Sequence, residues 1–506
     1  MVNLRLPSRV LAVLTFAVVV LTTAAWLRSP EYDEQYTLFL AGGTARPQWP
    51  EAPIQAAEVV ALQAGHADLA TVAADLRRVD VHPPLYFWTV SIWRACVGAS
   101  LLAARLFSVL CGVAALVIVS AIAVRCGIRP IPAMLLTLGC YGFVYTSIIA
   151  RGFALAQALT LGGVWMLTKR RTNTSLVAAG VLFGAATSCN YLSVFVGAAL
   201  GLLVRDWRLL AGAAPFLALD GWFFAAQHGA RHGQFPSFSL TAALTRLVAY
   251  QVAGLFGGLP LYADGVLRGA IAGGVGLLAL CLLVAIVATR PWMAGPNLRL
   301  LTVAAIAPAV GLLSLGLAFN NTPIELRYLC FGLPYIALLA AWACQQHAAK
   351  PAWSRLFFAP MGRGRAAWPL ALPYAVGAVQ CAAIAGLVLA PATMQPARSA
   401  ARAIAALGGK PDAATIVLLP RGNDGVGIVG AFGREVPATL RLLIISPTDT
   451  VLDIRSRTQP FSRVILALLG QDSDSRNCLP SMRRAFASPG WRLIAAGSNI
   501  EAYERE

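Results

Sequence analysis

Long apolar runs, separated by short polar segments, dominate the first 390 residues of the chain. A helix needs about 20 mostly apolar residues to cross a bilayer, and about eleven of the runs approach this length. These runs are 10–27, 103–124, 131–149, 152–168, 175–189, 191–204, 209–226, 269–289, 300–318, 327–344 and 371–389. The pattern predicts an all-α polytopic membrane domain over residues 1–390, with about eleven transmembrane helices.

The pattern changes at about residue 391, where charged residues become more frequent and apolar runs shorten to strand length. Four segments have the length and composition of strands, namely Thr415–Leu419, Leu440–Ile445, Val464–Leu469 and Trp491–Ala495. Segments 397–408 and 480–487 have helical spacing. Residues 391–506 are therefore predicted to form a small soluble α/β domain, which is within the usual size of a domain.

The basic residues give the predicted helices an orientation. The chain has a formal net charge of +18, and its Lys and Arg residues form short clusters between apolar runs, as in the cytoplasmic loops of membrane proteins. With Arg5 and Arg9 in the cytoplasm, the acid-rich loop 28–83 lies outside. A crossing at 84–98 would move the next clusters outside, so this segment is predicted to be a juxtamembrane helix within a first outer loop of 28–102. The C-terminal domain is then extracytoplasmic.

Composition also excludes some classes of protein. Hydrophobic residues make up 58% of the chain and charged residues only 12%. The basic clusters do not form a face with interleaved aromatic residues, so nucleic acid is not an expected partner. The ten cysteines show no metal-ligand spacing and fall mostly inside apolar runs, which indicates core residues rather than a disulfide framework or a zinc site.

Two acidic motifs lie at opposite ends of the outer loop, at the predicted membrane surface. Asp33 and Glu34 follow the first helix, and Asp80 with His82 precedes Pro83-Pro84. Charged groups at this depth are costly unless they are paired or used, so they are candidates for function. A carboxylate there can act as a general base. The alternatives are a solvated charge at a helix end and an incidental histidine at an ordinary helix start.

Three arginines begin predicted crossings at the same outer face: Arg105, Arg151 and Arg327. Arginine is suited to bidentate contacts with phosphate. A proline pair after His82 places that residue at a helix N-terminus, where a phosphate is also favoured. Each arginine taken singly could instead be an interfacial residue whose head reaches toward water.

These motifs give the chain a resemblance to the membrane glycosyltransferases of the GT-C class. It is similar to their bacterial branch, which is related to protein O-mannosyltransferases, lipid A aminoarabinose transferases and RgtA/B/C/D-like sugar transferases. The shared features are the Asp33-Glu34 pair, His82-Pro83-Pro84-Leu85-Tyr86-Phe87-Trp88, Ala104-Arg105-Leu106, Arg151-Gly152-Phe153-Ala154-Leu155 and Arg327-Tyr328. The chain departs from many members in having His82 instead of Lys and from some in having Phe153 instead of Tyr, which leaves the sugar undetermined.

The resemblance implies an inverting transferase of the bacterial inner membrane. It would move a hexose or pentose from a polyprenyl-phosphate donor to an extracytoplasmic glycolipid, polysaccharide or protein. By resemblance, Asp33 is the base with Glu34 beside it, and His82, Arg105, Arg151 and Arg327 contact the donor phosphate. Some relatives hold a divalent metal between two acids that correspond to Asp33 and Asp80, and no other cofactor is implied. The alternative function is a transporter or flippase of lipid-linked sugars, which would be expected to show paired halves and broken helices.

One glycine motif in residues 391–506 resembles a nucleotide-binding motif. Gly425-x-Gly427-x-x-Gly430 follows a predicted strand, as in a dinucleotide fingerprint. Residues 420–424 intervene between strand and motif, and the segment is short for a βαβ unit. Nucleotide binding by the tail is therefore not expected.

Overall fold

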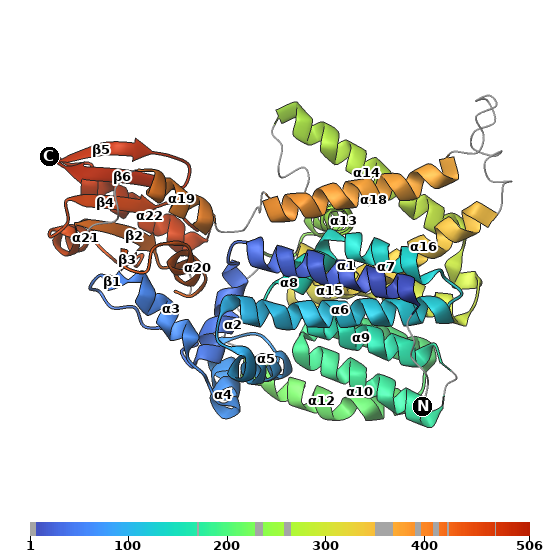
Figure 1. The fold of residues 1–506 in the computed structure, drawn as a ribbon. Coiled ribbons are helices and arrows are strands. Elements are labelled where there is room, and N and C mark those ends of the chain that lie inside the picture. Colours follow the sequence, from blue (N-terminus) through green and yellow to red (C-terminus); the bar gives the residue numbers. More distant parts are fainter. Residues whose placement is uncertain are drawn as a thin grey trace. The chain divides into compact units, whose positions relative to one another are not determined.

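The computed structural model describes residues 7–169, 172–227, 236–257, 265–349, 368–389, 396–407, 414–422, 425–470 and 472–506. The chain divides into two compact units, and each is described by itself (Figure 1). The first unit comprises Met1–Leu27, Asp80–Tyr86 and Arg105–Ala390. The second comprises Arg28–Val79, Phe87–Ala104 and Pro391–Glu506.

The first unit is a bundle of helices. Its elements are α1 (Ser8–Leu27), α6 (Leu101–Arg125), α7 (Pro130–Gly139), α8 (Tyr141–Ile148), α9 (Phe153–Leu167), α10 (Asn173–Cys189), η1 (Tyr191–Ser193), α11 (Val194–Val204), α12 (Trp207–Ala226), α13 (Leu240–Phe256), α14 (Gly265–Ala288), η4 (Pro291–Met293), α15 (Pro296–Phe319), η5 (Leu326–Gly332), α16 (Leu333–Ala349) and α18 (Trp368–Leu389). Among the described residues, seven helices are long and apolar enough to cross a membrane, or eight if one bent pair counts as a span. The polytopic helical fold class is confirmed. Every predicted crossing overlaps a helix of this unit, but 152–168, 175–189 and 191–204 correspond to the shorter apolar helices α9, α10 and α11, which are not among those seven or eight.

Two features of this unit were not predicted from the apolar runs: a bend within 131–149 and a helix between α12 and α14. The first segment bends by 71° between α7 and α8. Cys140 at the break has extended backbone angles, and Gln380 of α18 donates to the carbonyl of Leu136 at 3.4 Å. An apolar run alone does not reveal a break whose backbone groups a neighbouring helix satisfies. The predicted loop after α12 contains α13, whose apolar face packs on η5 and α8.

The second unit contains a six-stranded sheet with the order β1-β3-β2-β4-β6-β5. The strands are β1 (Ile54–Gln55), β2 (Thr415–Pro420), β3 (Arg441–Ile445), β4 (Arg463–Ala467), β5 (Trp491–Ala496) and β6 (Ile500–Arg505). β3, β2 and β4 are parallel, whereas β1, β6 and β5 pair antiparallel with their neighbours. Four of these strands were predicted, but β1 and β6 were not. A two-residue strand carries no periodicity, and β6 is rich in charge.

Helices cover both faces of this sheet, since the parallel strands are buried on both sides. The helices of this unit are α2 (Tyr32–Gly42), α3 (Ala56–Ala64), α4 (Leu69–Val79), α5 (Pro84–Val97), α19 (Ala397–Ala406), α20 (Gly427–Glu435), α21 (Val451–Thr458) and α22 (Ser473–Phe486). Of these, α2, α3, α19 and α20 contribute to the core on one face, and α21 and α22 contribute to the core on the other. Val417 and Leu419 face a core that includes Phe39 of α2 and Phe432 of α20. Ile416 and Leu418 face the core formed with α21 and α22. The outer loop thus shares one core with the C-terminal residues.

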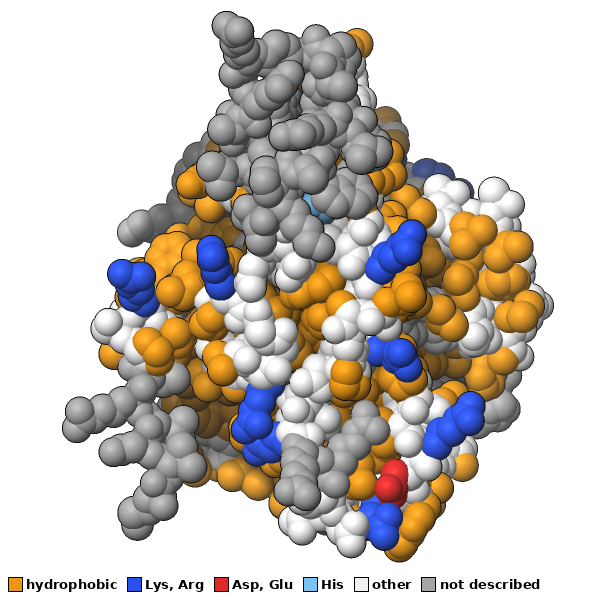
Figure 2. Space-filling model, turned by 90° about the vertical axis from the view of Figure 1, so that its right-hand side faces the viewer, with side chains coloured by type: hydrophobic (Ala, Val, Ile, Leu, Met, Phe, Trp, Pro, Cys, Tyr) orange, Lys and Arg blue, Asp and Glu red, His pale blue; other side chains and the backbone are white. Residues whose placement is uncertain are grey.

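Basic residues gather where α6, α9 and α14 end and α10, α12 and α15 begin. Asn297 of α15 donates to the carbonyl of Arg125 at the end of α6, and the Arg129 amide, just before α7, donates to Gln345 of α16. Figure 2 looks at this face, where Lys and Arg side chains are spread among apolar ones and acidic side chains are scarce. We refer to it below as the basic end of the bundle. Arg105 and Arg151 lie at the other end of their helices, α6 and α9.

Candidate active site

The turn before α5 is built around the carboxylate of Asp80, which is only 6% exposed. Its Oδ1 accepts hydrogen bonds from the backbone amides of Val81 at 2.6 Å and His82 at 3.2 Å. The same oxygen lies 2.5 Å from Nδ1 of His82. Pro84 then starts α5, and a proline fits there because the first helical N–H has no intrahelical acceptor. Asp80 therefore fixes both the turn and the orientation of the imidazole.

Arg151 reaches the other side of the same imidazole. Its Nη2 lies 2.8 Å from Nε2 of His82, and the arginine is 5% exposed. A guanidinium only donates hydrogen bonds, so Nε2 must accept and the proton of a neutral His82 sits on Nδ1, facing Asp80. Burial raises the pKa of the Asp80 carboxyl, but the hydrogen bond from His82 and the charge of Arg151 lower it more and hold this pKa well below its usual range. The result is an ordered cluster, Asp80–His82–Arg151.

Close backbone packing holds Arg151 at this place. A Cβ on Gly152 would lie 2.4 Å from the carbonyl oxygen of Cys189 and 3.2 Å from Cβ of Tyr86. Only glycine allows the chain to pass so close to α10 and to the residues after the proline pair. Phe153 then begins α9 and packs against Tyr328, with ring centroids 6.4 Å apart. The two sequence motifs, after His82 and after Arg151, are therefore in direct contact.

Gln227 completes the surroundings of His82, and sequence reasoning missed it. Its Nε2 donates to the carbonyl of His82 at 2.8 Å, its Oε1 accepts from the hydroxyl of Tyr191 at 3.2 Å, and the residue is 1% exposed. It directly follows α12, at the end of a predicted crossing. A glutamine at the end of an apolar run is an ordinary loop residue, so the sequence does not predict that Gln227 contacts His82.

The other two predicted phosphate contacts lie in the same unit with partners of their own. Arg105, in α6, donates from Nη1 to the carbonyl of Ala25 near the end of α1 at 2.7 Å. Arg327, in η5, forms an ion pair of 2.6 Å with Glu325 and lies over the ring of Tyr328. Both arginines are at the end of the bundle that holds Arg151. Arg327 is therefore held by Glu325 on one side and by the ring of Tyr328 on another.

Asp33 and Glu34 lie in the second unit, in the first turn of α2. Asp33 is half-buried and Glu34 fully buried. The carboxylate of Glu34 accepts from the backbone amide of Glu31 at 2.9 Å and closes a capping box. Glu31 in turn pairs with the buried Arg28. Glu34 thus has a structural task, which is to fix the helix start that carries Asp33.

Residues of α20 pack against α2 at close range. A Cβ on Gly427 would lie 2.2 Å from ring atoms of Tyr32, and one on Gly430 would lie 2.8 Å from Gln35 Oε1. The side chain of Gln63 donates to Gln35 and accepts from Arg434 of α20. Gly427 and Gly430, two of the three glycines of the nucleotide-like motif, therefore allow close helix packing, and α20 contacts the helix that carries Asp33.

Sequence reasoning also missed Arg94 of α5, which is fully buried. It donates to the carbonyls of Gln63 and Ala99 at 2.5 and 3.1 Å, and so joins α3 to the turn that follows α5. A single charge in an otherwise apolar interfacial helix was a usable signal, because such a charge needs buried partners.

A metal ion held between Asp33 and Asp80 stays a prediction, because the two acids belong to different units. Among the described residues there is no group of three His, Cys, Asp or Glu side chains that could hold a metal ion. Oδ1 of Asp80 already accepts three N–H groups, and Arg151 places a positive charge against His82.

The fold is that of solved membrane glycosyltransferases. The crystal structure of ArnT from Cupriavidus metallidurans bound to undecaprenyl phosphate aligns with 98% of this chain and 97% of its own, at TM-score 0.51 and 13% identity. The apo form aligns over the same shares at TM-score 0.52. No protein-family model and no curated protein matches the sequence. The resemblance to the GT-C class is confirmed at the level of the fold.

Proposed function

We propose that the protein is an inverting glycosyltransferase that uses a polyprenyl-phosphate sugar and acts on the extracytoplasmic face. The supporting observation is the Asp80–His82–Arg151 cluster: a buried guanidinium, oriented through a neutral imidazole, at one end of a bundle with the fold of ArnT. The ArnT structure holds undecaprenyl phosphate, and a lipid phosphate of that kind is the ligand that this arginine suits.

In the proposed reaction, Asp33 takes the proton of the acceptor hydroxyl. The acceptor oxygen forms a bond to the anomeric carbon from the face opposite the lipid phosphate. The bond between that carbon and the phosphate oxygen breaks, and the electron pair leaves with the polyprenyl phosphate. Arg151 and Arg105 stabilise the charge that develops on the leaving phosphate, an electrostatic effect that is large in a site shielded from water. One displacement inverts the anomeric configuration.

The residues around these groups hold them in place. Asp80 and Gln227 fix the ring and the backbone of His82, and His82 orients Arg151. Glu34 fixes the first turn of α2 by capping it. The remaining details are taken from the resemblance. The sugar is a hexose or pentose, the acceptor is a glycolipid, polysaccharide or protein, and the enzyme lies in the bacterial inner membrane.

One observation favours the alternative, a flippase of lipid-linked sugars. The helices α7 and α8 form a broken span with a bend of 71°, and transporters use broken helices at their binding sites. A flippase would move the lipid between leaflets without releasing polyprenyl phosphate. Measuring product and lipid movement in the same vesicles therefore separates the two functions.

The substitution Asp33→Asn tests the proposed base. Membranes carrying the wild type or the variant would be incubated with a panel of radiolabelled polyprenyl-phosphate hexoses and pentoses. Loss of a general base typically lowers the rate by about 10²–10⁴-fold, and we expect a loss in that range. Glu51→Gln is the matched control, since Glu51 is an exposed acid of the same outer loop. Wild-type transfer by Asp33→Asn would remove Asp33 from the mechanism.

A further inference from the structure

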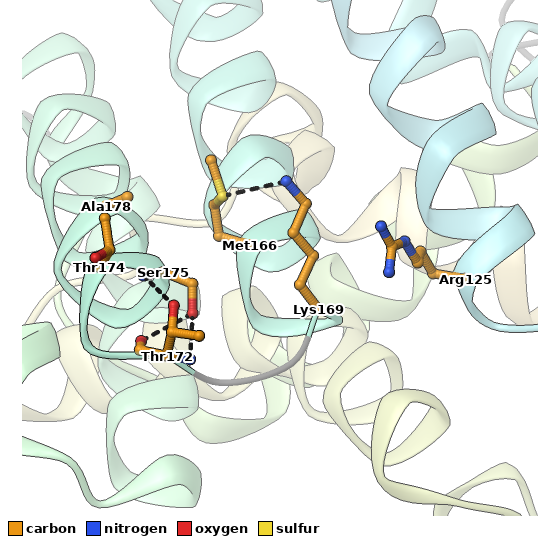
Figure 3. Close-up of a pocket in the computed structure, with 7 residues that line it drawn as sticks. All are labelled: Arg125, Met166, Lys169, Thr172, Thr174, Ser175 and Ala178. Carbon is orange, nitrogen blue, oxygen red and sulfur yellow. Dashed lines mark hydrogen bonds between the residues drawn. The ribbon is translucent and has the colours of Figure 1, made fainter. Parts of the chain in front are cut away.

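A second candidate site lies at the basic end of the bundle. It is a cavity of about 440 Å³ lined by Arg125, Met166, Lys169, Thr172, Thr174, Ser175 and Ala178 (Figure 3). These residues come from the end of α6, the end of α9 and the start of α10. α9 has 15 residues, and a helix of that length spans about 22 Å, so the cavity is far from Arg151 at the other end of α9.

The cavity is positively charged. Lys169 lies between Arg125 of α6 and the first residues of α10, and no acidic residue lines the cavity (Figure 3). None of the ion pairs that the structure gives between described residues involves either cation. Burial and the nearby charge of Arg125 both lower the pKa of Lys169. Two cations that line one cavity with no acidic lining residue repel each other, and a bound anion would relieve that repulsion.

Polar groups of α10 line the other side of the cavity. A capping box joins Thr172 and Ser175 and uses the backbone amides of both. The amides of Asn173 and Thr174 lie in the same first turn, at the positive end of a 17-residue helix. Backbone amides at such a helix start bind phosphate oxygens well. This helix start adds to the two cations, which come from other helices.

The remaining walls are apolar. Met166 and Ala178 line the cavity, and the ammonium of Lys169 lies 3.4 Å from the centroid of the Trp165 ring. The helices α6, α9 and α10 that meet here are apolar along their length, so the cavity opens at the depth where lipid headgroups lie. A phosphate with an attached acyl glycerol fits these walls better than a free ion does.

We propose that this cavity binds the phosphate group of an anionic membrane lipid, in the leaflet that the basic residues predict to be cytoplasmic. The site is independent of the proposed transfer reaction. It would anchor α6, α9 and α10 to the bilayer at the end opposite Arg151. Arg125 and Lys169 supply the charge, and the α10 start supplies the hydrogen bonds.

The test is lipid retention by the full-length protein in native mass spectrometry. The wild type would be mixed with phosphatidylglycerol, with zwitterionic phosphatidylcholine, or with inorganic phosphate. We expect selective retention of phosphatidylglycerol, and at least a tenfold weaker retention by the double variant Arg125→Gln/Lys169→Gln. The matched control is Arg290→Gln/Arg299→Gln, which removes two other exposed charges near the basic end and should retain the lipid.

Three results would overturn the proposal. The first is equal retention of phosphatidylglycerol by the wild type and the Arg125/Lys169 variant. The second is an equal loss in the control variant, which would mean that only total charge matters. The third is full displacement of the lipid by an equimolar amount of inorganic phosphate, which would assign the site to a free ion. Undecaprenyl phosphate should raise the Tm of both double variants as much as that of the wild type, because its proposed site is at the other end of the bundle. This measurement therefore distinguishes failure of the lipid-site proposal from failure of the proposed transferase function.

Discussion

At the scale of single residues, the candidate site depends on how polar groups are paired in places that exclude water. Asp80, His82 and Arg151 form a series in which each member fixes the next. A buried guanidinium left without partners would be strongly destabilising, so the acid and the imidazole are needed for folding as well as for orientation. The sequence analysis named all three residues as candidates for function, but it did not predict that His82 lies between Asp80 and Arg151.

Replacing Asp80 by Asn should destabilise the protein at every pH from about 5 to 8. Leaving a buried hydrogen-bond donor without its acceptor lowers the free energy of unfolding by about 1–3 kcal/mol. The pKa of Asp80 is lowered in the folded state, so its stabilising effect is complete above the ordinary aspartate pKa near 4 and is lost only as the pH falls through the lowered value. The difference in Tm between wild type and variant, measured by thermal unfolding in detergent, should therefore be constant over that range. A difference that shrinks from pH 8 to pH 5 would contradict this assignment.

Replacing Gly152 by Ala should weaken undecaprenyl phosphate binding. The new Cβ would meet the Cys189 carbonyl at 2.4 Å, and a backbone atom cannot move aside cheaply. Overpacking of this kind costs about 1–3 kcal/mol and would shift Arg151. Gly201→Ala is the matched control, because no atom lies within 4 Å of the Cβ position there. Equal binding by the two variants would show that the tight turn at Gly152 does not matter to the site.

At the scale of elements, α2 is held by its own capping box and by α20. Apolar runs and helix-start signals predicted most helices and four strands. They did not predict that β1 from the outer loop pairs with β3, because that contact joins Ile54 to Leu442 across almost the whole chain. Long-range pairing leaves little trace in a single sequence. The role of Gly427 was hidden for the same reason, since its neighbour Tyr32 is far away in the chain.

Replacing Gly427 by Ala should lower sugar transfer about tenfold to a hundredfold with little effect on undecaprenyl phosphate binding. The Cβ would displace the ring of Tyr32, which precedes Asp33, and small shifts of a catalytic group cost that much in rate. The control is Gly497→Ala in the same unit, where the nearest atom is 3.8 Å away. Transfer at the wild-type rate by a folded Gly427→Ala protein would argue against positioning by α20.

At the scale of the whole molecule, basic residues mark one end of the bundle and the candidate cluster the other. This is the arrangement that the charge distribution along the sequence predicted. The fold class followed from hydropathy, because every predicted crossing overlaps a helix. The bend between α7 and α8 and the helix α13 did not follow, since hydropathy measures how apolar a segment is and not where its backbone turns.

Cysteine labelling tests the orientation with native residues. Cys96 is exposed in the second unit, and Cys126 is half-buried just after α6 at the basic end. In a background with Cys281, Cys344 and Cys381 changed to Ser, a membrane-impermeant maleimide should label Cys96 in intact spheroplasts. Cys126 should react only after permeabilisation. Single variants Cys96→Ser and Cys126→Ser assign each signal. Labelling of Cys96 from the cytoplasmic side only would contradict the predicted topology.

The most direct test of the proposed function is the affinity for undecaprenyl phosphate of two variants, Arg151→Met and Asp33→Asn, measured as thermal stabilisation of the purified protein. Arg151→Met removes charge-assisted hydrogen bonds worth about 1.5–3 kcal/mol and should weaken binding by about tenfold to a hundredfold. Asp33→Asn should bind the lipid as tightly as the wild type, because the base contacts the acceptor. Unchanged binding by Arg151→Met, or an equal loss in both variants, would contradict the account.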